Sequence, residues 1–209
     1  IAGSAITSNT AAFSGGGVYI AASAAGQALL ADSVVATNTA NSGAGVYAVA
    51  QMTLTVMGGS IYNNASNTGG GGLYAEGALT LTDVTVYGNQ ANAGKGGGVY
   101  VGGAANLVGG ALYQNSSTSG GGGLYAAQAL SLSNVDVLSN TTDNEGLNIG
   151  DGGGVYAAGD ATLTGGLVQD NRCTHATCAG GGVYVSGRLF VTDTQFLQNS
   201  SGGGGGGAL

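Results

Sequence analysis

The chain has 209 residues, 45 of them glycine and none proline, and its three Lys+Arg against ten Asp+Glu give a formal net charge of −7. A hydrophobic fraction of 43% argues against a disordered low-complexity tract. The chain has no basic cluster that could follow a phosphate backbone, and no apolar run near the roughly 20 residues of a membrane-spanning helix. We therefore expect neither nucleic-acid binding nor membrane insertion by this segment.

A motif of glycines, one aliphatic residue and one tyrosine comes first in each repeat and recurs seven times. A fixed period of this length is typical of solenoid proteins. The residues on either side of each tyrosine are aliphatic or Ala, which predicts a short strand with those side chains inward and the tyrosine outward. The glycines allow a tight preceding corner. The tyrosines, separated by 28, 27, 26, 25, 31 and 28 residues, are Tyr19, Tyr47, Tyr74, Tyr100, Tyr125, Tyr156 and Tyr184.

The second element of each repeat alternates apolar and polar residues, as in the Leu-Thr-Leu-Thr of 79–82. This period of two predicts a strand with one buried face. After it stands a column of Gly, Asp and Asn, the residues that best tolerate a left-handed backbone, so we expect a corner there. The column consists of Gly3, Asp32, Gly58, Asp83, Gly109, Asn134, Gly165 and Asp193.

A third strand is predicted to run into an asparagine that stands three positions after an aliphatic or aromatic residue. An asparagine at an inward corner can satisfy backbone groups of its own and adjacent coils, so we interpret the column as structural. Four members also lie in Asn-x-Ser/Thr sequons, and glycosylation at Asn64, Asn115, Asn140 and Asn199 is the alternative if the column faces outward. The column consists of Asn9, Asn38, Asn64, Asn89, Asn115, Asn140, Asn171 and Asn199.

These elements predict an all-β fold, a right-handed parallel β-helix with three short strands per coil, about 27 residues per coil and seven to eight coils. Residues 1–209 would form a single β-solenoid domain, roughly 35 Å long at ~4.8 Å per coil. Because a parallel stack exposes strand edges at its ends, we expect further β-solenoid to cover them. It would come from a longer repeat protein or from copies of the chain stacked end to end.

Gly-Gly-x-aliphatic alternating with Phe-x-x-Asn resembles the repeats of the chlamydial polymorphic outer membrane proteins and related bacterial β-helix adhesins, which are surface-exposed autotransporter passengers. The resemblance covers nearly the whole chain. Phe-Leu-Gln-Asn at 196–199 fits the second motif fully, whereas Ile, Val or Leu replaces Phe elsewhere and a third glycine replaces a commoner Ala. The resemblance implies an extracellular, cell-surface location and a host surface or glycans as partners.

The seven tyrosines have two interpretations. Stacked aromatic rings add about 0.5–1.5 kcal/mol per pair and would stiffen the solenoid. Alternatively, a stripe of rigid amphipathic rings would bind sugars or protein surfaces at low entropic cost. The sequence leaves both open.

Two long loops carry the unusual chemistry, and both should project from the same corner of adjacent coils. The first, within 141–151, contains Asp143, Glu145 and Asp151, and is either a solvated acidic turn or a calcium site. The second contains Arg172, Cys173, His175 and Cys178. Two lone cysteines in an exported chain favour a disulfide, and a zinc site with His175 is the alternative.

Catalysis needs titratable groups gathered in one place, and here Lys95, Arg172 and Arg188 lie in loops or on different strands. We therefore expect no enzymatic activity and no cofactor. The predicted function is a non-enzymatic extracellular solenoid, the shaft of an adhesin or the subunit of a surface fibre. The alternative is a carbohydrate-binding or polysaccharide-degrading β-helix module.

Overall fold

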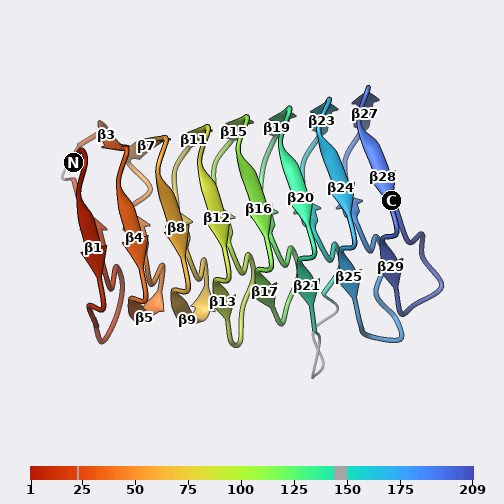
Figure 1. Cartoon of the computed structure of the whole chain (residues 1–209), viewed down its shortest axis with the longest axis horizontal. Coiled ribbons are helices and arrows are strands. Elements are labelled where there is room, and N and C mark those ends of the chain that lie inside the picture. The colour runs from red at the N-terminus through yellow and green to blue at the C-terminus, as the bar shows by residue number, and fades with distance from the viewer. Residues whose placement is uncertain (23, 144–149) are drawn as a thin grey trace.

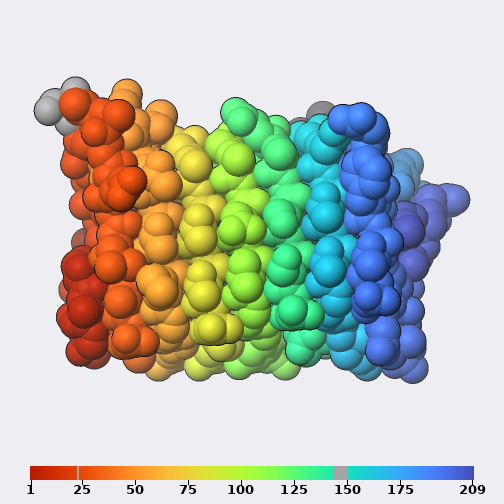
Figure 2. Space-filling view, turned by 90° about the horizontal axis from the view of Figure 1, so that it is seen from above, coloured from red at the N-terminus to blue at the C-terminus, as the bar shows by residue number. Residues whose placement is uncertain are grey.

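The computed structural model describes residues 1–22, 24–143 and 150–209, and its regular structure is β-strand (Figure 1). The chain winds into a parallel β-solenoid of about 7 turns with about 26 residues per turn, which confirms the predicted fold class. Successive coils form side-by-side bands along the long axis (Figure 2), with the N-terminal coil at one end and the C-terminal coil at the other. Among the described residues, no helix is long and apolar enough to cross a membrane.

The tyrosine motif forms the first sheet, here called the tyrosine sheet. Its register is exact, so that Tyr74 pairs with Tyr47 on one side and Tyr100 on the other. The flanking residues face the core as predicted; Val99 and Val101 have no exposed surface. The seven strands are β2 (Val18–Ile20), β6 (Val46–Ala48), β10 (Leu73–Ala75), β14 (Val99–Val101), β18 (Leu124–Ala126), β22 (Val155–Ala157) and β26 (Val183–Val185).

The alternating segments form the second sheet, here called the threonine sheet. In β11 the leucines Leu79 and Leu81 are buried while Thr80 and Thr82 stay partly exposed, as the period of two predicts. The seven strands are β3 (Gly26–Ala31), β7 (Met52–Met57), β11 (Leu79–Thr82), β15 (Ala105–Val108), β19 (Leu130–Ser133), β23 (Ala161–Thr164) and β27 (Leu189–Thr192).

The strands that lead to the asparagines form the third, eight-stranded sheet, which faces the viewer in Figure 1. Its central aliphatic column is buried, with Val86 and Val137 fully enclosed. The strands are β1 (Ala5–Thr7), β4 (Val34–Ala36), β8 (Ser60–Tyr62), β12 (Thr85–Tyr87), β16 (Ala111–Tyr113), β20 (Asp136–Leu138), β24 (Leu167–Gln169) and β28 (Gln195–Leu197).

The three predicted strands per coil are thus present, and a fourth short strand follows each asparagine from the second coil onward. We call this parallel ladder the short sheet. It was not predicted, because strands of mostly two residues carry no measurable period. The strands are β5 (Thr39–Ser42), β9 (Ala65–Gly69), β13 (Gln90–Ala91), β17 (Ser116–Ser117), β21 (Thr141–Thr142), β25 (Arg172–Cys173) and β29 (Ser200–Ser201).

Besides the glycine corner before each ladder tyrosine, left-handed backbone turns the chain at two further corners of every coil. All eight members of the predicted Gly, Asp and Asn column have φ between 47° and 65°. A second column, directly before each ladder asparagine, has φ between 52° and 61° and was not predicted, because its residue types are too varied to signal it. Its members are Ser8, Thr37, Asn63, Gly88, Gln114, Ser139, Asp170 and Gln198.

The first corner alternates between two types in successive coils. A Cβ added to Gly109 would lie 2.1 Å from Oδ1 of Asp83, and one added to Gly165 would lie 2.2 Å from Oδ1 of Asn134. A coil with a side chain at this corner is therefore followed by a coil with glycine, which leaves space for that side chain. The structural repeat is two coils rather than one.

Three glycines precede the aliphatic residue and tyrosine in six of the seven motifs, and they have three different roles, as the coil of Tyr100 illustrates. Gly96 has a φ of +64°, which favours glycine. A Cβ on Gly97 would lie 2.2 Å from the backbone oxygen of Ser116, so this glycine lets two backbones of the solenoid approach closely. A Cβ on Gly98 would lie 2.9 Å from the side-chain amide carbon of Asn115. The third glycine therefore makes room for the asparagine column.

Candidate functional site

The asparagine column forms a hydrogen-bond ladder inside the solenoid. Oδ1 of Asn115 accepts the backbone N–H and the Nδ2 of Asn89, both at 3.0 Å. Its own Nδ2 donates to the backbone oxygen of Val86 and to Oδ1 of Asn140, again at 3.0 Å. Each internal asparagine thus links its own coil to the coils on both sides. Its buried side-chain amide has a hydrogen-bond partner for each donor and acceptor position.

The ladder is continuous from Asn9 to Asn199, since each of the seven steps repeats the same pair of bonds to Oδ1. The sequon members Asn64, Asn115 and Asn140 are at most 1% exposed, and Asn199 is partly buried. In each of them Nδ2, the atom that would carry a glycan, already donates a hydrogen bond to a backbone oxygen. Glycosylation of the folded chain would break the ladder.

The seven predicted tyrosines form a stacked ladder on the outside of the tyrosine sheet. Neighbouring ring centroids are 4.2 to 5.5 Å apart, and their planes are tilted by 5° to 20°. A shorter ladder of Tyr62, Tyr87 and Tyr113 runs along the eight-stranded sheet at 4.7 and 4.8 Å. Because each internal ring is covered on both faces by its neighbours, these tyrosines present ring edges and hydroxyls to solvent rather than ring faces.

Charged side chains flank the tyrosine ladder at two places. Glu76 accepts a short hydrogen bond from the hydroxyl of Tyr47, and its other oxygen accepts the backbone N–H of Ala50 at 3.0 Å. Burial, followed by this bond and the glutamate charge, raises the pKa of Tyr47 well above its usual range. The ammonium of Lys95 lies 4.4 Å from the ring centroid of Tyr125 and 3.1 Å from its hydroxyl. Tyr125, which also stacks on Tyr100 and Tyr156, is 8% exposed, against 55% for Tyr19 at the end of the ladder.

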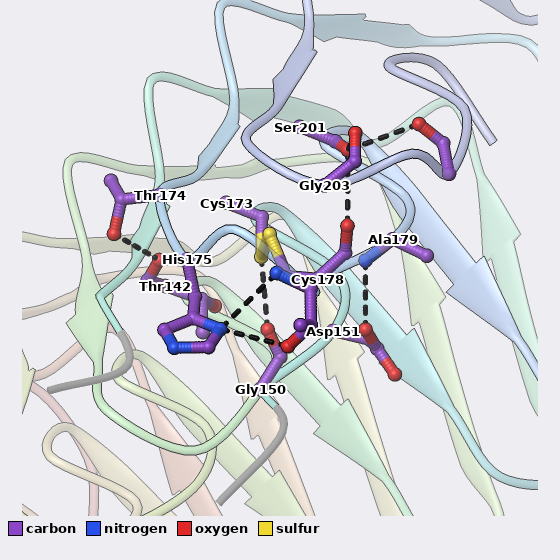
Figure 3. Close-up of a disulfide and its surroundings, with 12 residues drawn as sticks. Thr142, Gly150, Asp151, Cys173, Thr174, His175, Cys178, Ala179, Ser201 and Gly203 are labelled. Carbon is purple, nitrogen blue, oxygen red and sulfur yellow. Dashed lines mark hydrogen bonds between the residues drawn. A yellow bond between two sulfur atoms is a disulfide. The ribbon is translucent and has the colours of Figure 1, made fainter. Parts of the chain in front are cut away.

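The second long loop is closed by a disulfide between Cys173 and Cys178 (Figure 3). Both cysteines are buried, and Sγ of Cys173 lies 2.9 Å from the backbone oxygen of Gly150 in the coil below. The sulfurs are therefore bonded to one another rather than available to zinc. Nδ1 of His175 contacts Oγ1 of Thr177 at 2.8 Å and accepts the backbone N–H of that residue, so it organises its own turn.

The two long loops touch, as expected from their shared corner, but the partners of Asp143 and Asp151 are residues that the sequence did not single out. Oγ1 of Thr174 donates to Oδ1 of Asp143 at 2.6 Å, and the backbone N–H of Ala179 donates to Oδ1 of Asp151 at 2.8 Å. Glu145 lies outside the described residues. Among described residues, no group of three His, Cys, Asp or Glu side chains could hold a metal ion.

Arg172 and His175 are not hydrogen-bonded to these carboxylates in the described structure. The exposed Arg172 lies on the short sheet beside Thr141. The one ion pair found between described residues joins Arg188 to Asp160 at 2.7 Å on adjacent coils, and it lowers the pKa of the Asp160 carboxyl. The charged groups that the structure describes are thus distributed along the solenoid.

A groove along the short sheet is the feature that sequence reasoning missed altogether. It has a volume of about 380 Å³ and is lined by residues of β13, β17 and β21 and by those that directly follow these strands. The only signal in the sequence was the polar pair after each asparagine, such as Ser116-Ser117 and Thr141-Thr142. That signal could not be interpreted without the fourth strand.

No protein-family model, curated protein or solved structure matches the chain.

Proposed function

We propose that this chain is a non-enzymatic structural and adhesive β-solenoid of the extracellular surface, the shaft of an adhesin or the subunit of a fibre. The observation that carries the proposal is the asparagine ladder, which joins every coil to the next by side-chain hydrogen bonds parallel to the long axis. Together with the stacked tyrosines, this ladder adds rigidity along the axis of the rod beyond that of the β-ladders.

The disulfide supports the extracellular part of the proposal. Disulfides such as Cys173–Cys178 persist in oxidising compartments and are rare in the cytosol of most organisms. The same bond fastens the second of the two long loops to its coil, where an exposed protein needs protection from proteolysis. Further β-solenoid coils, from a longer chain or from another copy, are the proposed partners of the end coils.

A carbohydrate-binding module is the second candidate, and the groove on the short sheet is the observation that favours it. The two candidates are compatible, because an adhesin shaft can carry a binding groove on one of its faces.

Antibody labelling of intact native cells tests the surface location. We expect antibodies raised against the purified chain to label unpermeabilised cells and to lose the signal after brief external proteolysis. An antibody against a cytoplasmic protein serves as the control and should label permeabilised cells alone. Labelling that requires permeabilisation would contradict the proposal.

A further inference from the structure

Most of the residues that line the groove on the short sheet are polar. It crosses the neighbouring strands β13, β17 and β21, which lie side by side at the lower edge of Figure 1. The residues that line it are Gln90, Ala91, Asn92, Ser116, Ser117, Thr118, Thr141 and Asp143. The corresponding polar positions therefore recur at the spacing of the coils, about 4.8 Å.

The polar side chains of the short sheet fall into two sets. The inward set is satisfied within the protein, since Ser117 donates to the Gly120 oxygen and Thr142 to the Gly152 oxygen, both at 3.1 Å. The outward set is different. Within the described part of the chain, no hydrogen bond joins these side chains to other protein groups. They are Gln90, Asn92, Ser116, Thr118 and Thr141.

The chemistry of the outward set selects one class of ligand. Hydroxyl and amide groups both donate and accept hydrogen bonds, as the hydroxyls of a sugar do. Among the described residues that line the groove, the carboxylate of Asp143 is the only charged group, and it disfavours a polyanion. A peptide strand has no sheet edge to extend here, because the internal strands of the short sheet are paired on both sides.

We propose that this groove binds a neutral glycan chain lying across successive coils, with its hydroxyls bonded to the outward amides and hydroxyls of β13, β17 and β21. The proposal rests on the adhesive function proposed above and names its ligand. The rigid scaffold holds the side chains in register before binding, so that little conformational entropy is lost when the glycan docks.

Titration calorimetry of the whole chain with mannohexaose and cellohexaose tests the proposal, with oligogalacturonate as the charged comparison. We expect at least one neutral hexasaccharide to bind. The double variant Ser116→Ala/Thr141→Val should weaken this binding at least about fivefold, because each truncated side chain loses a hydrogen bond to the glycan.

A matched control lies on the threonine sheet, where Ser131 and Thr162 are also outward neighbours on adjacent strands. The variant Ser131→Ala/Thr162→Val should bind like the unmodified chain. If the groove variant does not fold, the exposed Gln90→Ala variant gives the same test. No binding of either neutral hexasaccharide, binding of oligogalacturonate alone, or equal loss in groove and control variants would overturn the proposal. None of these results bears on surface labelling, so the two proposals fail separately.

Discussion

Oδ1 of Asn115 accepts two hydrogen bonds from Asn89 of the preceding coil, one from the backbone N–H and one from Nδ2. A single amide therefore fixes both the backbone and the side chain of its neighbour. Repeated at every coil, this relationship extends a polar ladder through an otherwise apolar interior and leaves the internal amides fully satisfied. Such a ladder is stable only if each coil has the correct register, which makes it a device for specifying the stack.

Replacing one internal asparagine should therefore be costly. Asn115→Ala leaves the N–H and Nδ2 of Asn89 and the backbone oxygen of Val86 without this partner in a buried site. We expect a loss of about 2–4 kcal/mol in the free energy of unfolding, measured by urea denaturation. Asn106→Ala is the control, because Asn106 faces solvent on the threonine sheet, and its effect should stay within about 0.5 kcal/mol. Equal effects of the two substitutions would contradict the ladder account.

The glycine that lets two backbones approach gives a second prediction. In Gly97→Ala the new methyl group would meet the Ser116 backbone oxygen, so the coil must widen. We expect a destabilisation of about 1–3 kcal/mol, measured as a lower thermal midpoint. Gly204→Ala is the control, since nothing lies within 4 Å of a Cβ at that position. If the Gly97→Ala chain were as stable as the Gly204→Ala chain, the backbones at Gly97 and Ser116 could not be as close as described.

Stability should fall at alkaline pH because of the tyrosine ladder. Burial raises the pKa of Tyr74, and nearby Tyr100 raises it further. Burial and the contact with Glu76 raise the pKa of Tyr47. The unfolded chain releases these protons near pH 10, whereas the folded chain retains them, so the folded state binds more protons above that pH. The unfolding free energy should therefore decrease as pH rises beyond about 10.

An absorbance titration of tyrosinate measures this directly. We expect some tyrosines to ionise only as the chain unfolds, and Glu76→Gln to let Tyr47 ionise at lower pH. A single transition of all ten tyrosines near pH 10, without loss of structure, would contradict the ladder.

The disulfide should contribute modestly, because it closes a short loop with a sequence separation of 5. Cys173→Ser/Cys178→Ser should lower the unfolding free energy by about 2 kcal/mol in the chain-entropy model. Native, unreduced protein should take up no iodoacetamide, and reduced, unfolded protein should take up two equivalents by mass. Alkylation of native protein before reduction would show that the thiols are free.

The sequence predicted the parts of the fold in which the residue type is restricted by geometry. The corner at Asp83 and Gly109 was predictable because few residues tolerate a left-handed backbone, and the buried Leu79 and Leu81 followed from a period of two. The corner before each asparagine could not be predicted, because residues of many types occupy it; Gln114, for example, has the same left-handed conformation.

The candidate site divides in the same way. The proximity of the two long loops could be predicted, because both project from the same corner of adjacent coils. The residues that contact the two carboxylates could not be predicted. Thr174 and the backbone of Ala179 bind Asp143 and Asp151, whereas Arg172 and His175 do not. Such contacts depend on the backbone path of the loops, which the repeat does not determine. The groove required the short sheet, whose strands were not predicted.

Electron microscopy of native, antibody-labelled surface material tests the central claim most directly. The account predicts label along rods or fibres outside the cell, whose diffraction has an axial repeat near 4.8 Å from the stacked coils. Label confined to compact particles without that repeat, or found only inside the cell, would contradict a structural role for this solenoid.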